Sequence, residues 1–355
     1  MKVFFSFFLT CLLWSNTMSN SHLNNTAMAS EPLQKPTKLL FIHHSVGGQW
    51  LAHDYGGLVS ELNKNKIYVN DVTYGWEPPE LTNTITKKIM RFFSKVKRKL
   101  LSTDGSVRSA IGIGNRTDIG QMHDWFLGPD SEFIMNSAYK ENLETTSFGD
   151  HSNSTSQAPL ANPDISAENE IIMFKSCFPN TLLKGNPADP PVEINPPPLN
   201  FPAGSDEHTV ANAKRIFNEV LTYFRKHPDK FFVIVTPPPQ IVLPEKGQIA
   251  RGFSNWLVQD WLRENNYTMG NVMVFDLFNV LTSGTSSTKN DAGTEQGNHH
   301  RIWDGKVQHI IQSENNMLFY PQGKNDNHPS PAGLQKATAE FVPLLVHYFT
   351  LWQKA

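Results

Sequence analysis

The sequence predicts a doubly wound α/β fold, and two observations carry this prediction. Short apolar runs rich in β-branched and aromatic residues recur along the chain, as in strands buried on both faces of a parallel sheet. Segments with apolar residues at helical spacing lie between them, and this alternation is typical of doubly wound proteins. The 355 residues are enough to enclose a substantial core in one large domain.

The predicted strands and helices alternate along most of the chain. The strands are the runs KLLFIHH from Lys38, KIYVNDV from Lys66, EIIMFKS from Glu170, KFFVIVT from Lys230 and NVMVFDL from Asn271. The helices are expected within residues 48–63, 208–227, 251–264 and 331–352, where apolar side chains recur every three or four positions. Such apolar strands need cover on both faces, so we expect a parallel sheet between two layers of helices.

Two long segments interrupt this alternation. Residues 78–168 combine a basic amphipathic stretch, KKIMRFFSKVKRKLL, with a Ser/Thr/Asn-rich stretch, and residues 184–206 are rich in proline. Neither contains its own set of strands. We therefore expect both to form loops over one end of a single domain that spans residues 30–355.

The first residues have the features of an export signal. Lys2 precedes the apolar run VFFSFFLTCLLW, which is short for a membrane span, and Ala27 and Ala29 have the spacing that a signal peptidase needs. We expect residues 1–29 to be a signal peptide cleaved near Ala29. The mature chain would then be periplasmic or secreted, without stable membrane insertion. An uncleaved N-terminal anchor is the alternative.

The amino-acid composition argues against some classes of function. Only 18% of residues are charged and the formal net charge is -2, which argues against a nucleic-acid partner. Cleavage would remove Cys11 and leave Cys177 as the one cysteine, so no internal disulfide is expected. Cys177 follows an apolar strand near Lys175, which makes a reactive thiol one interpretation and an inert core residue the favoured one.

The segment FIHHSVGGQWL contains the first candidate catalytic residue. Ser45 directly follows the first predicted strand and precedes Gly47, Gly48 and a predicted helix. A serine nucleophile at this turn would have helix amide N–H groups close to a developing oxyanion. A serine that simply caps the helix is the alternative.

A second candidate segment, NDNHPSPAG, precedes the last predicted helix. A serine hydroxyl needs a base to take its proton, and the base needs a partner that holds its tautomer. His328 could be that base and Asp326 that partner.

The two segments together resemble the SGNH, or GDSL-type, hydrolase superfamily. FIHHSVGG stands where the family has its G-D-S block, NDNHPSPAG resembles its D-x-x-H block, and FFVIVTPPPQ and NVMVFDLFNVL resemble its fourth and fifth strands. HHS, FKSCFPN and HPSPAG are similar to a group of exported bacterial proteins assigned to this superfamily. The resemblance covers nearly all of the mature chain. It implies a flavodoxin-like three-layer α/β/α fold with a five-stranded parallel sheet, and ester hydrolysis by Ser45, His328 and Asp326.

The chain departs from the family pattern at two positions. His44 stands where the family usually has Asp, and the D-x-x-H spacing places Asn325 three residues before His328. We expect Asp326 to orient His328, because a carboxylate stabilises an imidazolium better than an amide does. Asn325 is the alternative.

The resemblance also implies an oxyanion hole. Its donors would be the Ser45 N–H, a glycine N–H after the second strand and an asparagine side chain after the third. Gly120 is the predicted glycine and Gly75 its alternative. Asn180 is the predicted asparagine, although strict register from the strand end would place Ser176 or Cys177 there.

We expect substrate contacts from His44, Trp50 and His300, since histidines and aromatic rings beside a cleft bind sugars. His299, His300 and His309 match no tight metal-ligand spacing, so no metal and no other cofactor is expected. The superfamily and the expected export favour an O-acyl, especially O-acetyl, ester on a small molecule or polysaccharide. An O-acyltransferase and a non-catalytic glycan-binding protein are the alternatives.

Overall fold

The computed structural model describes residues 32–82, 112–113, 118–142, 167–175, 177–193, 203–241, 244–284, 299–303, 305–311 and 315–355. The expected signal peptide lies outside these residues, as do the basic amphipathic stretch and the Ser/Thr/Asn-rich stretch. Much of the proline-rich segment is described.

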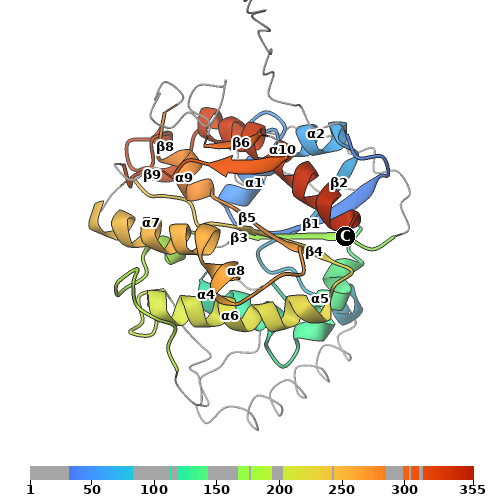
Figure 1. The fold of residues 1–355 in the computed structure, drawn as a ribbon, viewed down its shortest axis with the longest axis horizontal. Helices are drawn as coiled ribbons and strands as arrows, with labels where there is room; N and C mark the ends of the chain where they lie inside the picture. The colour runs from blue at the N-terminus through green and yellow to red at the C-terminus, as the bar shows by residue number, and fades with distance from the viewer. Residues whose placement is uncertain are drawn as a thin grey trace, which may run out of the picture.

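A five-stranded parallel sheet forms the centre of the molecule, with strand order β2-β1-β3-β4-β5 (Figure 1). This is the flavodoxin-like order, which confirms the predicted fold class. All five predicted strands are present. Their bounds are Thr37–Ile42 for β1, Ile67–Val72 for β2, Ile171–Lys175 for β3, Phe231–Val235 for β4 and Val272–Phe275 for β5.

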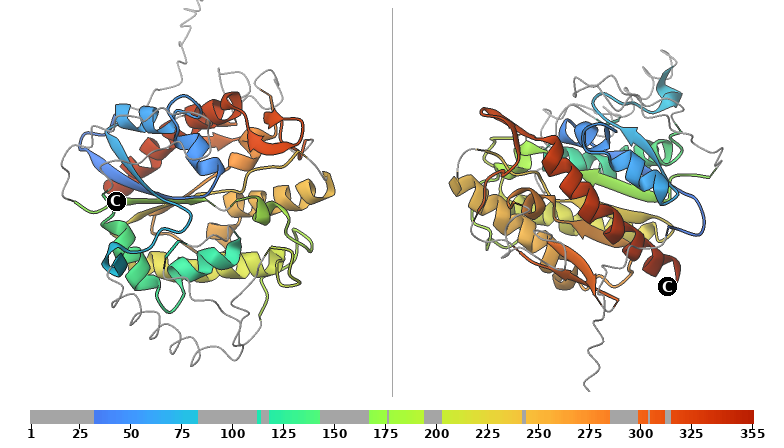
Figure 2. Two further views of the ribbon diagram at one scale, coloured as in Figure 1. Left: turned by 180° about the vertical axis from the view of Figure 1, so that it is seen from behind. Right: turned by 90° about the horizontal axis from the view of Figure 1, so that it is seen from above.

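Helices cover both faces of the sheet (Figures 1 and 2). One layer contains α1 (Val46–Leu51), α2 (Leu58–Lys64), α9 (Leu277–Leu281) and α10 (Pro331–Gln353). The other contains α4 (Ile119–Phe126), α5 (Ser131–Tyr139), α6 (Val210–Lys226), α7 (Pro244–Gln259) and α8 (Trp261–Glu264). Two 3₁₀ helices, η1 (Pro79–Thr82) and η2 (Phe178–Thr181), follow β2 and β3.

The apolar runs are continuous because the side chains of each strand pack into two hydrophobic cores, one on each face of the sheet. In β1, Leu39 and Phe41 pack with one helical layer, and Leu40 and Ile42 pack with the other. All four side chains are fully buried. Alternate residues of a strand point to opposite faces, so a strand buried on both sides needs apolar residues throughout.

The predicted helix over residues 48–63 is corrected to two helices, α1 and α2. Gly57 has a φ of 69°, which ends helical geometry before α2 begins. Gly56 lies so close to Trp50 that a Cβ at Gly56 would be 2.3 Å from the Trp50 carbonyl oxygen. The chain therefore turns sharply between the two helices.

Two antiparallel hairpins lie outside the central sheet. One pairs β6 (His300–Trp303) with β7 (Lys306–His309), and the other pairs β8 (Pro321–Gly323) with β9 (Asp326–Pro329). The β8–β9 hairpin leads directly into α10 and lies at the end of the molecule opposite the C-terminus (Figure 1). It carries Asp326 and His328 to the edge where the parallel strands end.

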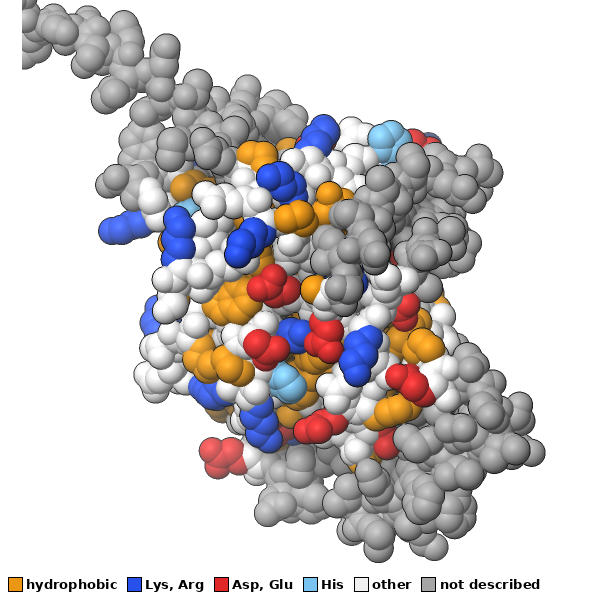
Figure 3. Space-filling model, turned by 90° about the vertical axis from the view of Figure 1, so that its right-hand side faces the viewer, with side chains coloured by type: hydrophobic (Ala, Val, Ile, Leu, Met, Phe, Trp, Pro, Cys, Tyr) orange, Lys and Arg blue, Asp and Glu red, His pale blue; other side chains and the backbone are white. Residues whose placement is uncertain are grey.

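The opposite end of the molecule, where α10 finishes, shows acidic, basic and hydrophobic side chains intermixed (Figure 3). The ion pair between Lys230 and Glu168 lies at the start of β4 on this side, with 2.9 Å between the charged atoms. Within the described part of the chain, no helix is both long and apolar enough to cross a membrane.

The first turn of α1 packs closely on the end of β1. A Cβ at Gly47 would lie 2.4 Å from the Cβ of His43, and His43 is held by Asp71 at 3.0 Å. A Cβ at Gly48 would meet only the His43 ring, at 3.7 Å. The two neighbouring glycines therefore have different steric roles.

Replacing Gly47 by alanine should destabilise the protein by about 1–3 kcal/mol, since the new methyl group overlaps a side chain that cannot move away. Urea unfolding of Gly47→Ala measures this. Gly48→Ala is the control and should stay within about 1 kcal/mol of wild type, because alanine favours a helix. Equal stability of the two variants would contradict the packing described here.

Candidate active site

Ser45 occupies a strained turn between β1 and α1. Its φ of 36° and ψ of -97° lie in a region that non-glycine residues rarely adopt. Such a conformation costs about 1–3 kcal/mol, and residues of this kind cluster at functional sites. Ser45 is the N-cap residue of α1, yet its side chain makes no capping hydrogen bond. The hydroxyl is therefore available for another partner.

That partner is His328, although 283 residues separate the two in sequence. His328 Nδ1 lies 2.6 Å from Asp326 Oδ1, so the carboxylate accepts the Nδ1 proton. His328 Nε2 is then an acceptor, and the Ser45 hydroxyl donates to it. The three side chains form one chain of hydrogen bonds from hydroxyl to imidazole to carboxylate.

Asp326 is held in its ionised form. The backbone N–H of His328 donates to Asp326 Oδ1 at 2.9 Å and is the main reason that the carboxyl pKa is lowered, with the imidazole contributing further. An ionised carboxylate in this position stabilises an imidazolium. Asn325, the alternative from sequence, lies in the turn between β8 and β9, and the contact to the imidazole comes from Asp326.

Three distant parts of the chain hold the β9 strand in place. The Tyr55 hydroxyl donates to the Pro329 carbonyl at 2.9 Å, and the Ile241 N–H donates to Asn327 Oδ1 at 3.0 Å. The Phe178 ring packs edge-on against the His328 ring, with 5.3 Å between centroids. The imidazole is thus positioned from several sides.

The His328–Asp326 pair is accessible to solvent. The side chains of His328 and Asp326 are 31% and 43% exposed, and Ser45 is half-buried. Solvent therefore reaches the imidazole and the carboxylate of the candidate site.

Asn180, in η2 after β3, has a defined amide orientation. Its Oδ1 accepts from the Ile119 N–H at 3.0 Å, which identifies that atom as the oxygen. His208 Nε2 lies 3.3 Å from the same oxygen and donates to it. Burial lowers the pKa of His208 to about 4, so the imidazole is neutral near pH 7.

The other end of the Asn180 amide is a buried donor. Among the described residues, Asn180 Nδ2 has no hydrogen-bond partner. A buried donor without a partner costs roughly 1–3 kcal/mol, and a ligand oxygen that reached it would remove that cost. Since Ile119 and His208 hold the oxygen, the NH2 group is fixed as a donor at the end of β3.

The two candidate glycines lie in different elements. Gly75 is in the turn directly after β2, with a φ of 72°. Gly120 is buried in the first turn of α4, next to Ile119 and so beside Asn180. The neighbour of Gly75, Tyr74, contacts Ser45 through its hydroxyl. In the sequence, the one indication that Tyr74 belongs to the site is its position just after the second strand.

Three predicted substrate contacts are corrected by burial. Trp50 is fully buried, and its indole N–H donates to Thr338 Oγ1 at 2.9 Å, so it packs between the sheet and α10. His44 is also fully buried, with its ring against Tyr74. His300 is bound to Glu340 in the interior. In each case the side chain lacks an exposed face on which a sugar could bind.

Cys177 is 2% exposed and contacts Lys175. His328 bonds to Ser45, which supports the serine over the thiol as the group that the base serves. Ser176, the other alternative for the donor after β3, lies outside the described residues.

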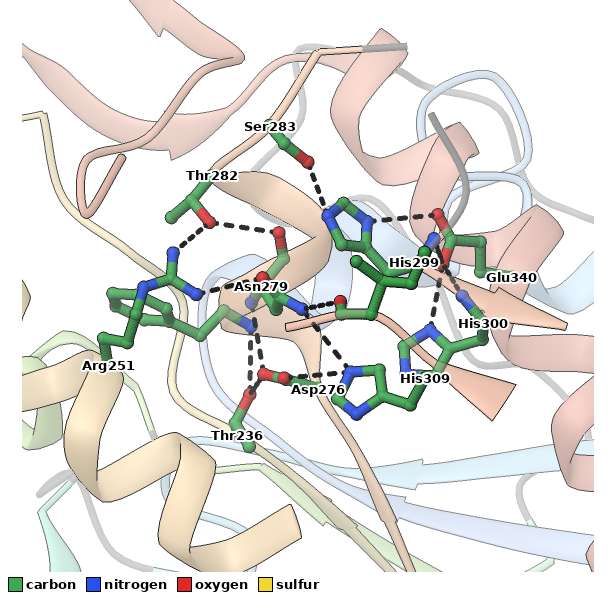
Figure 4. Close-up of polar contacts among 12 residues, drawn as sticks. Thr236, Arg251, Asp276, Asn279, Thr282, Ser283, His299, His300, His309 and Glu340 are labelled. Atoms are coloured by element: carbon green, nitrogen blue, oxygen red, sulfur yellow. Dashed lines mark hydrogen bonds and ion pairs between the residues drawn. The ribbon is translucent and has the colours of Figure 1, made fainter. Parts of the chain in front are cut away.

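The three histidines singled out from sequence belong to a buried polar cluster rather than to the Ser45 site (Figure 4). His299 Nε2 lies 2.7 Å from Ser283 Oγ, His300 Nδ1 2.9 Å from Glu340 Oε2, and His309 Nε2 3.3 Å from Asp276 Oδ2. These contacts tie the β6–β7 hairpin to α10 and to the end of β5. In the part of the chain that the structure describes, no group of three or more His, Cys, Asp and Glu side chains could hold a metal ion.

Glu340 is the charged centre of this cluster. Burial opposes its ionisation, but hydrogen bonds from His299 and His300 and the charge of Lys336 outweigh that effect and hold its pKa well below the usual value. Lys336 Nζ lies 3.2 Å from Glu340 Oε1. The backbone N–H groups of His299 and His300 also donate to Glu340.

Comparison with known proteins does not assign a function to the candidate site. No protein-family model matches the chain, and no curated protein matches it. Among solved structures, one described as a "putative acylhydrolase" from Bacteroides fragilis NCTC 9343 aligns over 95% of this chain and 98% of its own, with 9% sequence identity and a TM-score of 0.37. The fold class follows from the strand order of the sheet, and the candidate site follows from the contacts among its residues.

Replacing Glu340 by glutamine should lower the free energy of unfolding at pH 7 by about 3–5 kcal/mol, because the amide leaves a buried ammonium without its counter-charge. Chemical denaturation measures this. Glu61→Gln is the control, since Glu61 pairs with Lys64 at the exposed surface of α2 and should change stability by less than about 1 kcal/mol. A similar small effect at Glu340 would show that the cluster contributes little to folding.

Proposed function

We propose that this protein is an exported serine esterase that hydrolyses O-acyl esters. The hydrogen-bonded chain from Ser45 through His328 to Asp326 carries the proposal. The absence of a capping bond at Ser45 adds support, because a serine that served only to end the turn would use its hydroxyl on α1. The strained backbone at Ser45 also supports a catalytic role, because such strain clusters at functional sites.

In this mechanism the Ser45 oxygen attacks the ester carbonyl carbon while its proton passes to His328 Nε2. Asp326 stabilises the imidazolium that forms. The tetrahedral intermediate collapses when His328 gives the proton to the leaving alcohol, and the acyl group remains on Ser45. A water molecule, deprotonated by His328, then attacks the acyl-enzyme and releases the acid.

The oxyanion formed in both steps needs donors. We assign the Ser45 N–H, the Gly120 N–H and the Asn180 Nδ2 group to it, with the Gly75 N–H as the alternative to Gly120. The fixed orientation of the Asn180 amide supports its role, because Ile119 and His208 hold the oxygen away from the oxyanion. Preorganised donors of this kind need no rearrangement during the reaction.

The substrate class we propose is an O-acetylated carbohydrate. The exposed fractions of His328 and Asp326 support a bulky substrate, because such a site does not have to enclose the whole molecule. The resemblance to SGNH hydrolases and the expected export of the chain favour the acetyl group and the glycan.

Hydrolysis of p-nitrophenyl acetate tests the reaction. Ser45→Ala should reduce kcat/KM at least about 10³-fold, and Asp326→Asn by about 10⁴-fold where it disturbs the tautomer of His328. Ser60→Ala is a matched control: Ser60 also bonds a histidine, His53, at 2.5 Å, but that pair is on the exposed surface. Full activity in Ser45→Ala, or none in wild type with this ester and with acetylated xylan, would refute the proposal.

Removing the Asn180 side chain should lower kcat by about 10²–10³-fold with little change in KM, because the amide acts on the oxyanion rather than on the bound ester. The measurement is steady-state kinetics of Asn180→Ala. Denaturation of the same variant checks that it folds. An increase in KM with unchanged kcat would assign Asn180 to substrate binding instead.

A further inference from the structure

Tyr74 stands at the candidate active site without a role in the mechanism above. It follows β2 in the turn that precedes Gly75, and its side chain is 38% exposed. Its ring packs edge-on against the buried His44 ring, with 4.4 Å between centroids. His44 directly precedes Ser45, so this contact fixes the phenol beside the proposed nucleophile.

The Tyr74 hydroxyl contacts the reacting residue itself. It is hydrogen-bonded to the Ser45 side chain and accepts the Ser45 backbone N–H. That N–H is one of the proposed oxyanion donors, so the Tyr74 oxygen lies next to the position that a substrate carbonyl oxygen would take. Burial, followed by the nearby Cys177 thiol, raises the Tyr74 pKa to about 12, so the group is a neutral O–H that can donate.

We propose that Tyr74 is a catalytic residue whose hydroxyl donates a hydrogen bond to the oxyanion formed when Ser45 attacks an ester. This proposal rests on the proposed esterase function and adds a donor to it. The substrate carbonyl oxygen displaces the hydroxyl from the Ser45 N–H, and the O–H then turns to the same oxygen. The partly exposed ring leaves the side chain free to make this small shift, while His44 keeps it at the site.

Placement at the end of β2 supports this role. Ser45 follows β1, Asn180 follows β3 and Tyr74 follows β2, and these three strands are neighbours in the parallel sheet. Their carboxyl ends meet at one edge, so three donors from three strands can surround one oxygen. A hydroxyl with a raised pKa can donate to a negative charge without giving up its proton.

The test compares two substitutions at this position, using the full chain and p-nitrophenyl acetate. Tyr74→Phe keeps the ring on His44 and removes only the hydroxyl, whereas Tyr74→Leu removes both. If the hydroxyl serves the oxyanion, both variants should lose about 10²-fold in kcat with KM nearly unchanged. Tyr68→Phe, at the other end of β2, is the control and should keep wild-type kinetics.

Three outcomes overturn the proposal. Wild-type kcat in Tyr74→Phe with loss only in Tyr74→Leu would mean that the ring has a packing role. A higher kcat/KM in Tyr74→Phe would mean that the hydroxyl obstructs the site. A fall in kcat/KM that comes from KM alone would mean that it binds substrate. In all three, activity that still depends on Ser45 would leave the esterase proposal standing, whereas an inactive wild type would remove the basis of both.

Discussion

Strand β1 lies between β2 and β3, at the point where the strand order of the sheet reverses direction. In open α/β sheets, connections leave toward opposite faces at such a point, and ligands bind beyond the carboxyl ends of the two strands. Ser45, Tyr74 and Asn180 follow β1, β2 and β3, so all three come after the carboxyl ends of neighbouring strands. The site depends on that topology before it depends on any single side chain.

The second requirement is the docking of the β8–β9 hairpin. Its strand β8 is exposed, β9 is half-buried, and the hairpin belongs to no larger sheet, so its own pairing cannot position His328. The position comes from Tyr55, Phe178 and the Ile241 backbone, which reach it from three other parts of the chain. A hairpin held only by long-range contacts is in place only when the rest of the domain has folded.

Two polar networks in the molecule have different functions. Around Glu340, His299, His300 and Lys336 form a buried charged network, which ties the β6–β7 hairpin to α10. Around Ser45, the groups are partly exposed, and Asn180 keeps a buried donor without a partner among the described residues. A buried ion-pair network is closed to solvent, whereas a donor beside partly exposed groups can bond to an approaching ligand.

The sequence by itself determined the five strands and the segments that hold Ser45, Asp326 and His328. It missed α4 and α5, which belong to one helical layer but lie within residues 78–168, where loops were predicted. Apolar runs and turn residues are local signals, because they favour strands and turns whatever the rest of the chain does. Only the tertiary structure decided which side chains face the site. Trp50 and His300 were expected to contact substrate but lie in the core. Apart from the position of Tyr74 after β2, nothing local indicated that Tyr74 contacts Ser45 or that His208 contacts Asn180. The physical reason is that burial and hydrogen-bond partners are set by contacts between residues far apart in the chain, which no short segment records.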